Sequence, residues 1–168
     1  PATNGNGTFV SGIMTARFDP TAAVIPFPNN LLSQGTRDLT INAPAANPNN
    51  FGDPTVALNA LDGFSTTAPL TTAFSAAIAP GTLVAGSTVR VFEVQIVTSG
   101  AATGAVQRVV RELASPAEYV VAVATSDAAA RTLAIVPTRP LEELKSYMAV
   151  VTNGVTDTAG NNATPDLT

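Results

Sequence analysis

The second half of the chain alternates apolar and polar residues with the two-residue period of a β-strand that is covered on one face. The clearest run, 88–97, places Phe92 and Val94 on one face, which we expect to point into a core. Glu93 and Gln95 fall on the other face, which we expect to meet solvent. Similar runs predict further strands at 71–78, 106–113, 119–125, 132–136 and 147–152.

The first half alternates less regularly and is richer in turn-forming residues. Residues 13–18 have the period of a strand, and a short strand is expected at 38–41 within the mostly loop segment 35–54. Pro26 and Pro28 each lack the N–H donor that a central strand needs, so this stretch is expected to be irregular.

One helix is indicated, by its capping residues. Asp53 can accept hydrogen bonds from the first turn, and Pro54 is suited to the first helical position. The helix can continue to Leu61, and Gly63 is the expected left-handed exit.

This pattern predicts an all-β fold, an immunoglobulin-like antiparallel β-sandwich with one short helix and long loops in the first half. We expect a loose N-terminal arm and first strand over 1–17, followed by a single domain over 18–168. Tyr147, three residues after Leu144, fits a tyrosine corner, in which the phenol bonds to upstream backbone. The alternative is that Tyr147 only begins an amphipathic strand.

The amino-acid composition excludes several classes of function but says less about the fold. The 168 residues include no Cys and no His, which removes thiol nucleophiles, the usual catalytic triad and most zinc sites. A net charge of −4 disfavours nucleic acid as a partner. The chain is 45% apolar but only 12% charged and begins at Pro1 without a signal segment, which favours a trimmed or mature part of an exported bacterial protein. No cofactor is expected.

Two polar stretches resemble catalytic or metal-binding motifs. Ser65 follows Gly63, but Thr67 stands where a nucleophile elbow needs glycine, so we interpret Ser65 as a turn residue. Asp157 opens an Asp-Thr-Ala-Gly sequence that has no second copy to form an aspartic-protease pair. A calcium site is the weaker alternative in this region, and its candidate oxygen ligands are Asp157, Asn161, Asn162 and Asp166.

Several runs of residues resemble the N-terminal domain of bacterial virulence-factor extracellular lipases. They are Phe18-Asp19-Pro20, Val24 to Leu32, Leu58 to Pro69, Val89 to Val94, Leu133 to Pro137 and Tyr147 to Asn161. The first half carries the specific part of this resemblance. The second half is also similar to many bacterial immunoglobulin-like modules, so a stalk or adhesion module of a surface protein remains the alternative.

The resemblance implies a non-catalytic accessory domain on the bacterial surface or outside the cell. Its implied partner is a downstream α/β-hydrolase domain of the same polypeptide that carries the triad, and it implies no catalytic residue in this chain. A lipid or membrane surface is a second possible partner. Because the loops are more specific in sequence than packing requires, we expect them to form the domain contact. The candidate contact residues are Pro26, Phe27, Pro28, Asn29, Asn59, Leu61, Asp62, Phe64 and Pro69.

Overall fold

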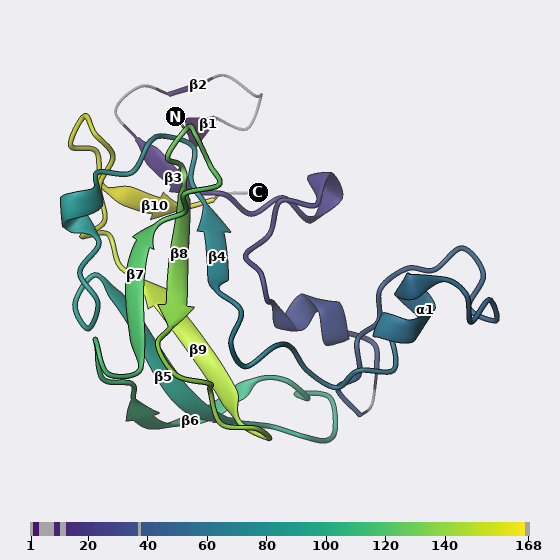
Figure 1. The fold of residues 1–168 in the computed structure, drawn as a ribbon. Coiled ribbons are helices and arrows are strands. Elements are labelled where there is room, and N and C mark those ends of the chain that lie inside the picture. Colours follow the sequence, from purple (N-terminus) through teal and green to yellow (C-terminus); the bar gives the residue numbers. More distant parts are fainter. Residues whose placement is uncertain (1, 4–8, 11–12, 37, 167–168) are drawn as a thin grey trace.

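Two three-stranded antiparallel sheets form the body of the computed structural model, which describes residues 2–3, 9–10, 13–36 and 38–166 (Figure 1). One sheet has the order β4 (Leu70–Ala73), β8 (Thr132–Pro137), β7 (Tyr119–Val123). The other has the order β6 (Val106–Glu112), β5 (Val89–Ile96), β9 (Ser146–Val151). The predicted all-β sandwich is confirmed, and its immunoglobulin-like character stays a prediction.

Two further strand pairs involve the ends of the chain. β3 (Met14–Ala16) pairs with β10 (Ala163–Pro165), and this pair is parallel, which the sequence pattern did not indicate. β1 (Ala2–Thr3) pairs antiparallel with β2 (Phe9–Val10), and the remaining residues of the predicted N-terminal arm lie outside the described part of the chain. Met14 is fully buried, so the first strand contributes to the core.

The chain between β3 and β4 makes a long excursion that leaves the strands on one side (Figure 1). It contains the 3₁₀ helices η1 (Pro20–Ala22) and η2 (Asn30–Ser33) and the helix α1 (Pro54–Leu58), which lies at the far end (Figure 1). A third 3₁₀ helix, η3 (Pro80–Thr82), connects β4 to β5. The predicted short helix and long loops of the first half are therefore confirmed.

The helix α1 begins as predicted but ends earlier. An Asp53 Oδ1 oxygen accepts a hydrogen bond of 2.9 Å from the Thr55 N–H. The expected continuation to Leu61 was wrong, because the Ala60 and Leu61 N–H groups bond three residues back, which tightens the last turn and closes the helix. Gly63 does not have the positive φ of a left-handed exit.

The strand predicted at 38–41 is absent from the described residues. Leu39 has a φ of 65°, which is outside the extended region. The Ile41 N–H donates to the Leu61 carbonyl at 2.8 Å, and the Asn42 N–H donates to the Leu32 carbonyl at 2.6 Å. These bonds connect loop to loop, so the backbone groups are satisfied without a sheet.

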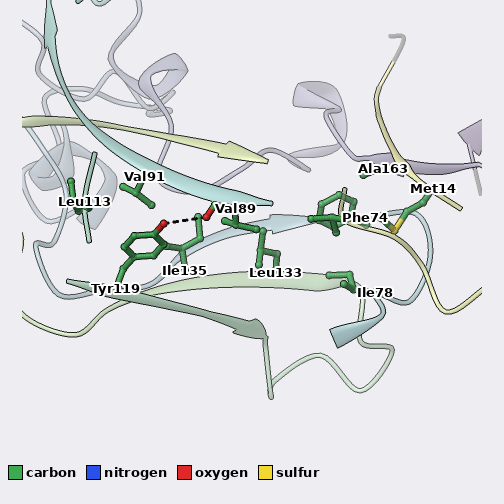
Figure 2. Packing of buried hydrophobic residues seen from close by; sticks show 11 residues of the cluster. Met14, Phe74, Ile78, Val89, Val91, Leu113, Tyr119, Leu133, Ile135 and Ala163 are labelled. Carbon is green, nitrogen blue, oxygen red and sulfur yellow. Dashed lines mark hydrogen bonds between the residues drawn. The ribbon is translucent and has the colours of Figure 1, made fainter. Parts of the chain in front are cut away.

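The core lies between the two sheets and extends to the β3–β10 pair (Figure 2). Tyr119 is its largest fully buried side chain. Its hydroxyl donates to the Val89 carbonyl at 3.1 Å and accepts from the Gly86 N–H at 2.9 Å, so the phenol is satisfied inside the core. The cluster consists of Met14, Phe74, Ile78, Val89, Val91, Leu113, Tyr119, Leu133, Ile135, Val155 and Ala163.

The predicted inner face of β5 was wrong at two positions. Glu93 is buried, whereas Phe92 is only partly covered, with the Arg90 guanidinium 4.8 Å above its ring centroid. The pairing register with β6 shifts between Glu93 and Val94, so both residues are buried in succession. The alternation of apolar and polar residues predicts a strand, but a bulge changes which of its residues face the core.

The tyrosine-corner interpretation of Tyr147 is confirmed by its hydrogen bond. The Glu142 N–H, five residues upstream, donates to the Tyr147 hydroxyl at 3.0 Å. This bond fixes the connection between β8 and β9 at the edge of the sandwich.

Candidate domain-contact surface

Phe27 and Phe64 form an exposed aromatic pair at the base of the excursion. Their ring centroids lie 5.6 Å apart at an interplanar angle of 79°, an edge-to-face arrangement. Despite this contact, Phe27 is 49% exposed and Phe64 is 37% exposed. The structure therefore brings together the two segments, 26–29 and 59–69, that the sequence analysis singled out.

Backbone hydrogen bonds attach this pair to the sandwich. The Phe27 N–H donates to the Thr71 carbonyl at 2.9 Å, and the Thr71 N–H donates to the Phe27 carbonyl at 2.7 Å. Thr71 belongs to β4, whose backbone pairs in register with β8. The backbone of Phe27 is thus held by a strand of the sandwich.

Asn59 fixes the second segment through its side-chain amide. Its Oδ1 accepts from the Ala43 N–H at 2.8 Å, and its Nδ2 donates to the Ala43 carbonyl at 2.9 Å. Together with the Ile41 to Leu61 backbone bond, these contacts hold the chain after α1 against the loop before it. Asn59 therefore acts as a positioning residue, and only part of its surface is exposed.

The nine candidate residues divide into exposed and supporting positions. Asn29, one of the supporting residues, accepts the Leu31 N–H at 2.8 Å through Oδ1 and caps η2. Pro26, Pro28 and Asn59 are also partly buried. We define the contact surface as the five exposed members, which are Phe27, Leu61, Asp62, Phe64 and Pro69.

Ser65 has the local hydrogen bonds of a turn residue. Its Oγ accepts from the Thr67 N–H at 3.3 Å and from the Ala68 N–H at 3.1 Å. Since the chain has no histidine, and the one lysine, Lys145, is paired with Glu93, the geometry supplies Ser65 with no ordinary base.

The four calcium-ligand candidates do not share one arrangement. Asp157 is buried, and its carboxylate accepts from the N–H groups of Ala159 and Asn161 and from Asn161 Nδ2, at 2.8 to 2.9 Å. Asn162 Nδ2 donates to a backbone carbonyl, and Asp166 accepts from the Phe18 N–H. A cation at Asp157 would have to displace these donors.

Burial raises the pKa of Asp157, but the hydrogen bonds from Asn161 and Ala159 outweigh it and leave the pKa below its ordinary value. Within the described ranges, no group of three or more Asp and Glu side chains is placed to hold a metal ion.

Two buried glutamates and three cations form an ion cluster at one end of the sandwich. Arg111 Nε lies 3.0 Å from Glu93 Oε2, and its Nη1 lies 2.9 Å from Glu118 Oε2. Arg139 Nη2 pairs with Glu118, and Lys145 Nζ lies 3.1 Å from Glu93. The cluster connects β5, β6, the turn before β7 and the connection to β9.

The electrostatics of the ion cluster keep both glutamates charged. Arg111, and after it the Ala114 N–H, lowers the pKa of Glu118 to about 2. Lys145, and after it Arg111, lowers the pKa of Glu93, and Glu118 raises the pKa of Arg111. Beside the cluster, a cavity of about 240 Å³ is lined by Arg111, Leu113, Glu118, Arg139, Pro140, Leu141, Glu142 and Tyr147.

This ion cluster was not predicted from the sequence. One signal was available, because charged residues make up only 12% of the chain, yet Glu93 and Arg111 fall in two successive predicted strands. Opposite charges on neighbouring strands of one sheet are candidates for a cross-strand pair, and Glu93 and Arg111 are in fact directly opposite.

Comparison with known proteins identifies a family for most of the chain. A family model described as bacterial virulence factor lipase N-terminal matches residues 9–165. No curated protein and no solved structure matches. In the part of the chain that the structure describes, every helix is too short or too polar to cross a membrane.

Proposed function

The chain belongs to the bacterial virulence factor lipase N-terminal family, and we propose that it is the non-catalytic leading domain of an extracellular or surface lipase. Its proposed partner is the α/β-hydrolase domain that follows it in the same polypeptide. The hydrolase supplies the nucleophile and its base. The chain shown here positions that domain and shapes the approach to its lipid entrance.

The observation that carries this proposal is the exposed pair Phe27–Phe64. Large aromatic side chains with fixed backbones are typical of the buried anchors of protein interfaces. Burying the exposed parts of both rings would remove about 170 Å² of apolar surface from water, which corresponds to at most about 4 kcal/mol. Asp62, on the same contact surface, offers a carboxylate to a hydrogen-bond donor of the partner.

The surroundings of the pair also favour a domain contact. Phe27 is bonded to the backbone of β4, and the side chain of Asn59 holds the segment that leads to Phe64. A surface whose shape is fixed before binding loses little conformational entropy when it meets a partner.

The experiment compares the longer polypeptide with a variant carrying Phe27→Ser and Phe64→Ser. We expect the variant to lose lipase activity or show separate unfolding of its two domains, because the contact no longer couples them. The matched control carries Val109→Ser and Val110→Ser, which alter two valines of β6 that are exposed to a similar extent. Equal activity and coupled unfolding in both variants would contradict the proposed contact.

The non-catalytic role has its own test. The purified 168-residue chain should not hydrolyse a chromogenic fatty-acid ester, since Ser65 lacks a base. Turnover that persists after treatment with a serine-directed inhibitor would show that the chain has a catalytic centre of its own.

A further inference from the structure

Phe51 is the most exposed aromatic side chain of the excursion, at 85%. It lies in the turn that leads into α1, the element at the far end of the excursion (Figure 1). Among the described residues, its ring packs against no other aromatic ring. Leu58, the last residue of α1, is 48% exposed and adds apolar surface to the same end of the excursion.

Local hydrogen bonds fix the backbone on both sides of Phe51. The Asn50 N–H donates to the Asn47 carbonyl at 3.0 Å, and the Asp53 N–H donates to the Asn50 carbonyl at 2.9 Å. Asn50 Oδ1 also accepts from the Gly52 N–H at 3.2 Å. Because these turns already order the backbone, inserting the ring into an apolar phase requires little further ordering.

The charge of this region determines which kind of lipid surface it can enter. Residues 37–64 contain Asp38, Asp53 and Asp62 and one cation, Arg37, which gives this range a net charge of −2. A surface of anionic lipids would repel these carboxylates, whereas basic residues are the usual means of binding such a surface. A lipid surface with zwitterionic or uncharged headgroups imposes no such repulsion.

We propose that the turn around Phe51 inserts into a lipid surface with zwitterionic or uncharged headgroups and holds the domain there. The choice of lipid rests on the membership of a lipase family, but the insertion does not involve the contact surface or the hydrolase domain. A ring on a fixed turn gives reversible attachment, because a single aromatic side chain buries little area.

The test measures binding of the 168-residue chain to phosphatidylcholine vesicles by sedimentation. Phe51→Ser should weaken partitioning about tenfold, the expected effect of removing one buried aromatic side chain. The control is Leu144→Ser, which removes a side chain that is 99% exposed but lies outside the excursion. It should leave partitioning unchanged.

A second arm adds phosphatidylserine to the vesicles at low salt. Binding should decrease, and added salt should restore it, since the repulsion is electrostatic. Absence of binding by the unmodified chain, equal losses in Phe51→Ser and Leu144→Ser, or stronger binding to phosphatidylserine would each overturn the inference. Failure of this test leaves the domain-contact proposal unaffected, because the hydrolase domain is absent from it.

Discussion

Replacing Glu118 by glutamine removes the charge on which two arginines of the ion cluster converge. Glu118 is only 7% exposed, and its carboxylate contacts Arg111, Arg139 and the Ala114 N–H. Glutamine keeps the size and some hydrogen bonds of the side chain, so the substitution tests the charge and not the packing.

The expected loss of stability follows from the pKa of Glu118. Contact with Arg111 above all lowers this pKa from its ordinary value of 4.5 to about 2. Such a change corresponds to about 3 kcal/mol of stabilisation. Because the side chains of Arg111 and Arg139 are 37% and 60% exposed, water screens part of the interaction, and we expect Glu118→Gln to cost about 2 kcal/mol near pH 7.

The pH dependence has a definite sign. The folded-state pKa lies below the unfolded value, so the contribution is present above about pH 5 and is lost as the pH falls toward 2. Urea unfolding at several pH values in this range measures it. The difference in unfolding free energy between the unmodified chain and Glu118→Gln should shrink as the solution becomes more acidic.

Glu143 provides the matched control for this measurement. It is exposed and forms no ion pair among the described residues, so Glu143→Gln should change stability by less than about 0.5 kcal/mol. Equal stability of the two variants at neutral pH, or a deficit of Glu118→Gln that is the same at all pH values, would contradict a stabilising charge at Glu118.

Three further substitutions test the core, the tyrosine corner and the Asp157 loop. Tyr119→Phe should lower the free energy of unfolding by about 1.5 kcal/mol, because it removes both hydrogen bonds of the buried hydroxyl, whereas the Gly86 N–H and the Val89 carbonyl keep their bond of 2.9 Å to each other. Tyr147→Phe should lower the free energy of unfolding by less than about 1 kcal/mol, because Tyr147 is only partly buried whereas Tyr119 is fully buried. Equal losses for the two tyrosine variants in urea unfolding would contradict this expectation. Asp157→Asn should lower the thermal midpoint at neutral pH, with a deficit that narrows in acid because the pKa of Asp157 is lowered, and added calcium should leave the midpoint of the unmodified chain unchanged.

Local sequence signals predicted most of the strands and the start of the helix. Alternating residues gave β5, β7 and β8 to within a few residues, because a strand covered on one face needs a two-residue period. The Asp53-Pro54 pair located the start of α1, since a capping carboxylate and a proline act through neighbouring residues alone.

Features that depend on distant residues could not be obtained in this way. Which face of β5 is buried depends on the bulge beside Glu93 and on cations from two other segments. The parallel pairing of β3 with β10 joins residues about 150 positions apart, and no local pattern encodes it.

The contact surface was also predicted only in part from the sequence. The resemblance singled out the segments that contain Phe27 and Phe64, but periodicity alone gave no reason for the two rings to meet. Their contact depends on the bridge from Phe27 to β4 and on the amide of Asn59, which holds the other segment from a distance. Tertiary hydrogen bonds of this kind are not visible in the order of residues.

Hydrogen exchange of the contact surface measures whether the proposed hydrolase domain covers it. The measurement compares backbone amides of residues 59–66 in the isolated 168-residue chain and in the longer polypeptide with the proposed hydrolase domain, with the exposed strand β6 as internal reference. The amides of residues 59–66 should exchange at least about tenfold more slowly in the longer polypeptide, whereas exchange in β6 should not change. Identical exchange of 59–66 in the two proteins would contradict the proposed domain contact.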